Sequence, residues 1–147
     1  MDTQLLAGFY ERDLRRLIEE LNLFNDEQNL WKTGGSVKNS CGNLALHIIG
    51  GLNHLIGGTL AYTGYVRDRN LEFSRKDVPK AILLAQLEEL IALIAKTLNT
   101  LPPEALDAEY PAFFDKPHTS TGYVLTQLLL HLNYHLGQVN YLRRMLE

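Results

Sequence analysis

Apolar residues recur every three or four positions in four segments of the chain, the spacing that places them on one face of an α-helix. The segments run over about 3–24, 40–65, 79–101 and 119–146. None of them alternates polar and apolar residues as a half-buried strand does. The expected buried stripes are Leu6, Tyr10, Leu14, Leu17, Leu21 and Phe24; Leu44, Ile48, Leu52 and Leu55; Leu83, Leu87, Leu90, Ile94 and Leu98; and Leu125, Leu128, Leu132, His135, Val139, Leu142 and Leu146. The pattern predicts an all-α protein, a four-helix bundle forming one domain over residues 1–147.

Capping residues mark where these helices begin and end. Ser40 is a good N-cap for the second helix, and Thr119 or Ser120 can start the last one. The charged stretch 67–76 is expected to be a connection that leads to the third helix, and Pro79 fits the first turn of that helix. The second helix is unusually rich in glycine, at Gly42, Gly50, Gly51, Gly57, Gly58 and Gly64. Since each interior glycine costs up to about 1 kcal/mol relative to alanine, we expect close packing there in return.

Composition narrows the class of protein. The chain has 147 residues, a net charge of −3 and 46% hydrophobic residues, as in an ordinary soluble domain, so no nucleic-acid partner is expected. No apolar stretch reaches the roughly 20 residues needed to cross a bilayer, and no membrane partner or leader peptide is expected. The single cysteine, Cys41, excludes an internal disulfide and suits the cytoplasm, where we expect the protein to be. We interpret it as a small residue near a helix start rather than a catalytic thiol.

Histidines on two of the predicted helices are the candidate functional residues. His131 and His135 are four residues apart, so their side chains leave the same helix face one turn apart. Both rings can then point at a common ion, at about 2.0–2.1 Å from each nitrogen. His47 lies beside the apolar stripe of the second helix and can supply a third ligand. His54 lies about 10 Å further along that helix, so one ion cannot comfortably reach both.

The competing interpretation is that these histidines are hydrogen-bonded core residues without a metal. A buried cluster of imidazoles would then leave several donors and acceptors to satisfy in an apolar interior, which favours the metal site. Leu132 follows the first histidine, so the glutamate of the H-E-x-x-H protease motif is missing, and no Glu-x-x-His is present for a di-iron site. The chain also has no P-loop and no G-x-S-x-G elbow. Three nitrogen ligands leave an open coordination position, the pattern of a catalytic metal.

Other polar residues border this predicted site. Gln138 follows His135 by three positions, and Asn43 precedes His47 by one helical turn, so either can support a ligand or orient a substrate. Tyr134 is a further candidate for substrate orientation. His118 follows a proline in a loop and is expected to be exposed to solvent.

These segments resemble the DinB/YfiT-like superfamily of metalloenzymes. The stretch 42–47, Gly-Asn-Leu-Ala-Leu-His, is similar to one branch of it, and 131–138 looks like its H-x-x-x-H-x-G-Q signature. The tract 63–69, ahead of Glu72-Phe73, also looks characteristic of that branch. The resemblance covers essentially the whole chain. One difference is Leu136, where the commonest form of the motif has arginine.

The resemblance implies an up-down-down-up bundle with His47, His131 and His135 as the metal ligands. It also implies zinc or nickel as the ion and a homodimer as the assembly. Some members transfer low-molecular-weight thiols such as bacillithiol or mycothiol to small-molecule substrates. We therefore expect a metal-dependent enzyme, a thiol transferase in detoxification or stress response, although the ligands equally permit hydrolysis. The alternative is a metal-binding stress-response or interaction protein without catalysis.

Overall fold

The computed structural model describes residues 2–111 and 119–147, and within them the chain is all-helical. The α-helices are α1 (Thr3–Asn22), α2 (Cys41–Leu52), α3 (Arg69–Ser74), α4 (Lys80–Thr100) and α5 (Thr121–Leu146). Shorter elements are the 3-10 helices η1 (Glu27–Trp31) and η3 (Pro103–Leu106), and the π-helix η2 (Asn53–Gly58). The predicted all-α class is therefore confirmed. No helix among these residues is long and apolar enough to span a membrane.

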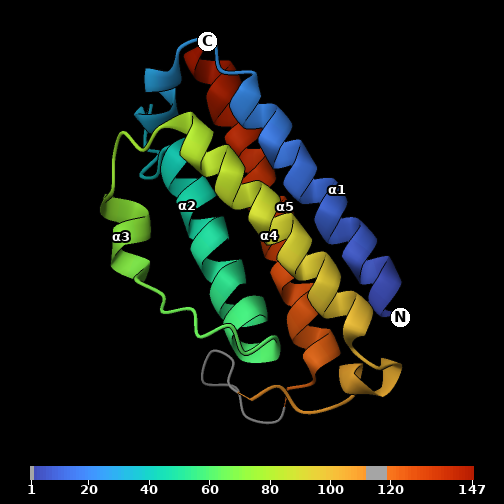
Figure 1. Cartoon of the computed structure of the whole chain (residues 1–147). Coiled ribbons are helices and arrows are strands. Elements are labelled where there is room, and N and C mark those ends of the chain that lie inside the picture. Colours follow the sequence, from blue (N-terminus) through green and yellow to red (C-terminus); the bar gives the residue numbers. More distant parts are fainter. Residues whose placement is uncertain (1, 112–118) are drawn as a thin grey trace.

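Four long helices, α1, α2, α4 and α5, lie side by side (Figure 1). In this view α1 and α5 run in one direction, and α2 and α4 run in the other. The connection from η2 to α4 carries α3 along the side of α2 and returns the chain to the end where α2 began. Because of this return, α2 and α4 are parallel and α3 covers the outer side of α2.

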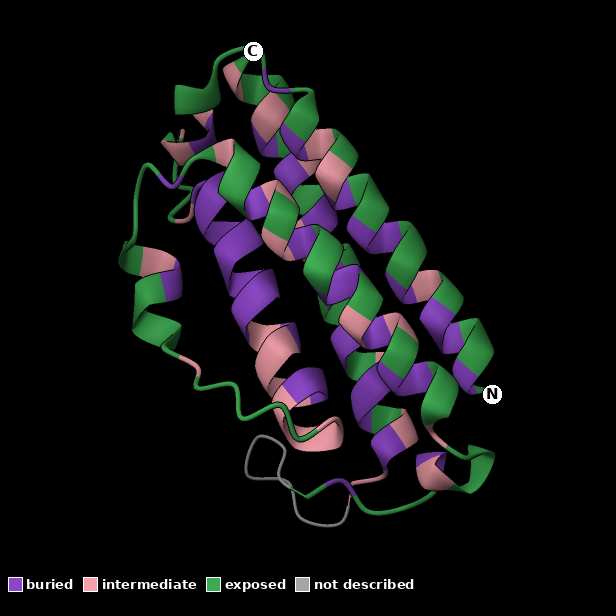
Figure 2. Cartoon of the chain, viewed as in Figure 1, coloured by how far each residue is buried: buried purple, intermediate pink, exposed green. Residues whose placement is uncertain are grey.

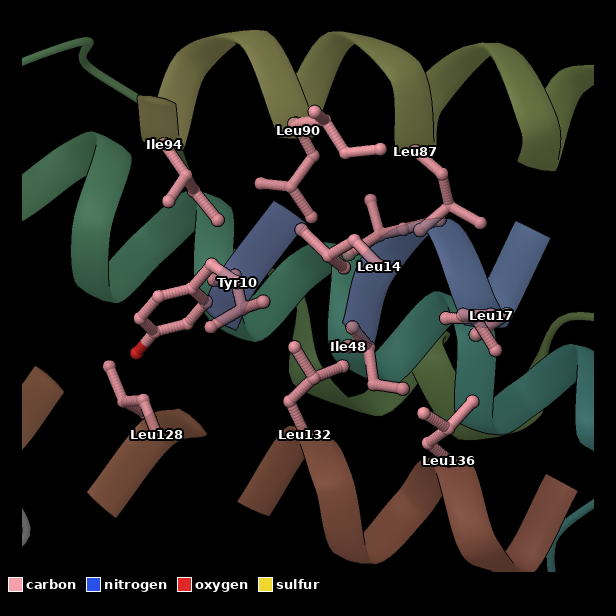
Figure 3. Close-up of a cluster of buried hydrophobic side chains, with 14 of the residues drawn as sticks. Tyr10, Leu14, Leu17, Ile48, Leu87, Leu90, Ile94, Leu128, Leu132 and Leu136 are labelled. Carbon is pink, nitrogen blue, oxygen red and sulfur yellow. The ribbon is translucent and has the colours of Figure 1, made fainter. Parts of the chain in front are cut away.

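The apolar stripes predicted from the sequence meet in a common core between the four long helices (Figure 2). Figure 3 shows side chains from α1, α2, α4 and α5 pointing toward one another, including Tyr10, Ile48, Leu90 and Leu132. Burying one such side chain stabilises the fold by about 1.5–3 kcal/mol. All of the predicted stripe residues are buried except Leu55, His135 and Leu146, which are half-buried.

Side-chain caps fix the starts of four of the α-helices. Asp2, Ser40, Asp68 and Ser120 each accept a hydrogen bond from the backbone N–H three residues further on. Each such cap is worth about 1 kcal/mol. Ser40 and Ser120 cap α2 and α5 as predicted.

Three predictions about the region from the end of α2 to the start of α4 are wrong. The second helix was expected to reach residue 65, but the helical conformation ends at Leu60, after the π-turns of η2. The backbone then leaves the helical region, with positive φ angles at Tyr62 (53°) and Gly64 (77°). The stretch 67–76 was expected to be only a connection, but it contains α3. Pro79 directly precedes α4 as its N-cap residue rather than standing in the first turn.

The glycines of α2 allow close packing on two sides of the helix. This packing was expected, because interior glycines destabilise a helix unless they allow a close contact. A side chain at Gly42 would lie 2.7 Å from the ring of Trp31, which covers that part of the helix. A Cβ at Gly50 would overlap the carboxylate of Glu72 and lie 2.7 Å from its Cδ. The absence of a side chain at Gly50 therefore makes room for a carboxylate from α3 against α2.

Candidate metal site

Three histidine side chains converge between α2 and α5. His131 Nε2 lies 3.1 Å from His47 Nε2 and 3.0 Å from His135 Nε2. One ligand atom from each ring can be chosen so that all lie within 4.8 Å of one another. The structure thus brings together the three residues predicted from the sequence, with His47 rather than His54 as the third.

The spacing of these nitrogens fits a shared divalent ion. Two nitrogens bound at about 2.0–2.1 Å lie about 3.0 Å apart in octahedral geometry and about 3.4 Å apart in tetrahedral geometry. The observed distances of 3.0 and 3.1 Å match the first value and need an expansion of a few tenths of an ångström for the second. These two distances are therefore compatible with an ion bound through Nε2 by His131 and by each of its two neighbours.

A carboxylate fixes the orientation of His47. Its Nδ1 lies 3.0 Å from Oε1 of Glu72, a buried residue of α3. Arg67 donates to both oxygens of this carboxylate, from Nε to Oε2 and from Nη2 to Oε1, each at 2.9 Å. An ionised carboxylate only accepts hydrogen bonds, so the proton of His47 is on Nδ1 and the lone pair of Nε2 faces the cluster. Carboxylate–histidine–metal arrangements of this kind are common at protein metal sites.

Gln138 performs the same task for His135. Its Oε1 lies 2.7 Å from His135 Nδ1 and accepts a hydrogen bond from the N–H there, so the Nε2 lone pair again faces the cluster. The prediction that Gln138 borders the site is confirmed.

Asn43 supports the histidine cluster indirectly, through hydrogen bonds to the backbone of the segment that carries Glu72. Its buried side-chain amide donates to the backbone oxygens of Glu72 and Arg75, at 3.0 and 2.8 Å. It therefore holds α3 against α2, which places the Glu72 carboxylate beside His47.

The hydrogen-bonding capacity of the three rings is incomplete without a cation. With the Nε2 lone pairs of His47 and His135 both directed at His131 Nε2, one proton on that nitrogen can serve only one of them. The other pair of nitrogens then faces each other with lone pairs alone. A cation at the centre accepts all three lone pairs, so the donor set fits a metal.

The environment keeps two of these rings neutral, the form that binds metal. Burial lowers the pKa of His131 to about 4, with further lowering by the nearby His135, His47 and two arginines of the α3 region. Burial also lowers the pKa of His47 below its usual value, against the opposing effect of Glu72.

We expect the stability of the metal-free protein to fall between about pH 6.5 and pH 4. A histidine in the unfolded chain takes up a proton near pH 6.5, whereas His131 in the folded chain does so only near pH 4. In this interval the unfolded state binds more protons, so the free energy of unfolding decreases as the pH falls. Urea unfolding at pH 7 and pH 5 measures the change. The His131→Gln variant keeps the other ionisable side chains, so its free energy of unfolding should fall less from pH 7 to pH 5. An equal fall in both proteins would contradict the expectation.

The remaining candidates lie outside the cluster. His54 is on η2, and its buried Nδ1 has no hydrogen-bond partner among the described residues. Cys41 is fully buried, and burial raises the pKa of its thiol to about 12, which agrees with a packing role. Tyr134 is exposed, with its ring edge-on to His135. The prediction for His118 concerns a position outside the described residues.

Glu72 and Arg67 are functional candidates to which the sequence interpretation gave no role. Both lie in the charged stretch expected to be a connection, and they were noted only as part of the family resemblance. The signal that could have found them is the glycine pair 50–51 on the facing helix, which leaves room for large side chains beside His47.

Comparison with known families gives a match that covers nearly the whole chain. The model of a family described as "Protein of unknown function (DUF1572)" matches residues 10–147. The chain belongs to this family. The part that matches DUF1572 includes His47, His131 and His135 together with Glu72 and Gln138. A search of curated proteins gives no match.

Proposed function

We propose that this DUF1572 protein is a divalent-metal-dependent enzyme in which His47, His131 and His135 hold the ion. One observation carries the proposal: three Nε2 atoms converge, and two of their lone pairs are directed inward because the Nδ1 atoms of His47 and His135 donate hydrogen bonds to Glu72 and Gln138. Zinc and nickel are the proposed ions because both accept imidazole nitrogen readily.

We also propose that the fold is the up-down-down-up four-helix bundle of the DinB/YfiT-like superfamily. The directions of α1, α2, α4 and α5 support this assignment, as does the origin of the ligands from α2 and α5 (Figure 1).

The proposed reaction is nucleophilic attack by a small thiol or water on a small-molecule substrate. When bound to three protein nitrogens, a divalent ion has an open position and lowers the pKa of a thiol or water there. Glu72 and Gln138 keep the histidines in the ligating tautomer, and Arg67 balances the charge of the Glu72 carboxylate. Tyr134 stands exposed beside His135, where it can contact a bound substrate.

Metal analysis and turnover together test the proposal. Protein purified without a histidine tag should contain about one zinc or nickel ion per chain. Metal-loaded protein should accelerate the reaction of low-molecular-weight thiols with a haloaromatic electrophile, and metal-free protein should not. Bound metal without any turnover on thiol-transfer and hydrolysis panels would support the non-catalytic metal-binding role instead. Absence of stoichiometric metal would contradict the proposal that the three histidines hold an ion.

A further inference from the structure

A cavity of about 200 Å³ opens beside the histidine cluster, between α2 and α5. His47 and His131 form part of its lining at one end. The wall is otherwise mostly apolar, with Ile48, Leu52, Leu55, Leu128 and Leu132. Because the lining residues continue from His47 along α2 and into η2 as far as Leu55, the cavity extends about two helical turns away from the cluster.

The volume limits what the cavity can hold. A cavity of about 150 Å³ lined by aliphatic side chains is large enough to bind benzene. The cavity of about 200 Å³ therefore has room for a body the size of one aromatic ring and a short polar group.

The polar part of the lining is positively charged. Arg67 and Arg69 both line the cavity together with the uncharged Gln127, and no acidic side chain among the described residues does so. Arg67 is already paired with the carboxylate of Glu72. The guanidinium of Arg69 lies 5.3 Å from the ring centroid of Phe73 and has no ion pair with an acidic residue in the described parts of the chain. Arg69 is thus a cation at the cavity that an anionic ligand can neutralise.

We infer that this cavity binds a small carboxylate with an apolar body about one ring in size. The carboxylate contacts Arg69 and approaches the open side of the histidine cluster, and the body lies between Leu52, Leu55 and Leu128. The inference rests on the proposed function, because the second contact of the carboxylate is with the metal ion proposed to bind at the three histidines. It gives that site a substrate class: small organic acids.

Phenylacetate and its neutral analogue phenylacetamide test this inference by calorimetric titration of zinc-loaded protein. Phenylacetate should bind at least tenfold more tightly than phenylacetamide. The Arg69→Gln variant should reduce this preference at least threefold, and the contact of the carboxylate with the metal site should keep the remainder. Arg144→Gln is the matched control, because Arg144 also lies over an aromatic ring, that of Tyr141 at 5.6 Å, but on the last turn of α5. It should leave both affinities unchanged.

A second variant tests the apolar part of the cavity. Leu55→Trp adds volume at a half-buried position of the wall and should weaken both compounds at least tenfold, while thermal melting shows whether the protein is folded. Equal affinity for the two compounds, or a preference unchanged by Arg69→Gln, would overturn the inference.

Zinc content measured in the same samples separates this inference from the proposed function. Stoichiometric zinc without a preference for phenylacetate refutes the carboxylate site and leaves the metal site intact. A preference that depends on Arg69 in protein that binds no zinc supports the carboxylate site and refutes the metal site.

Discussion

The His131→Ala variant should lose stoichiometric metal, with an affinity more than about a hundredfold lower than that of the parent protein. Removing a residue that only supports a ligand typically costs 10–100-fold, and removing a ligand should cost more. His131 is the central ring, since its Nε2 is close to the Nε2 atoms of both His47 and His135. Competition with a zinc chelator, together with elemental analysis, measures the loss.

Thermal melting gives a second measurement of the same effect. A ligand present at one hundred times its dissociation constant stabilises the folded state by about 2.7 kcal/mol. Added zinc should therefore raise the melting temperature of the parent protein but not that of His131→Ala.

His54→Ala is the matched control for this experiment. It removes the same type of side chain from η2, which continues α2, outside the cluster of three rings. It should keep the metal and the zinc-dependent rise in melting temperature. If His131→Ala retained zinc as well as His54→Ala does, the three-histidine site would be wrong.

The long helices could be predicted because their periodicity reflects burial. Leu83, Leu87 and Leu90 recur at helical spacing and are fully buried, so the pattern identified both the helix and its inward face. The same reasoning placed His131 and His135 on one face of α5. The choice between His47 and His54 depended on distance along α2, and the family resemblance favoured His47. The structure agrees with that choice.

The support for His47 could not be predicted in the same way. The helix α3 has only six residues, a length at which an isolated helix is marginal in water, and tertiary bonds from Asn43 hold it in place. A charged residue such as Glu72 is normally expected at the surface. It is buried here because Arg67 pairs with it and Gly50 makes room for it, and both are properties of the packed structure.

The Gly50→Ala variant should lower metal affinity about 10–100-fold by displacing Glu72. The new methyl group would overlap the Glu72 carboxylate and lie 2.7 Å from its Cδ and 3.2 Å from its Cγ. The side chain must then swing away, and its bonds to His47 and Arg67 are lost. Overpacking of this kind also costs on the order of 1–3 kcal/mol of the free energy of unfolding. Zinc titration and urea unfolding measure the two effects.

Gly137→Ala is the control for the change of glycine to alanine within a helix. A Cβ at Gly137 meets nothing within 4 Å, although this residue lies two positions from His135. The substitution should leave metal affinity unchanged and raise the free energy of unfolding by up to about 1 kcal/mol, because alanine favours the helix.

A double-mutant cycle decides whether Gly50 acts through Glu72. The atoms that a methyl group at Gly50 would meet are Oε2, Cδ and Cγ of Glu72, and all three are absent from the Glu72→Ala variant. In that background Gly50→Ala should cause no further loss of metal affinity, since the collision and the hydrogen bond to His47 are both already gone. Two substitutions that act independently would instead multiply their effects on affinity. Such a multiplication would show that Gly50 supports the site by some route other than making room for the carboxylate that orients His47.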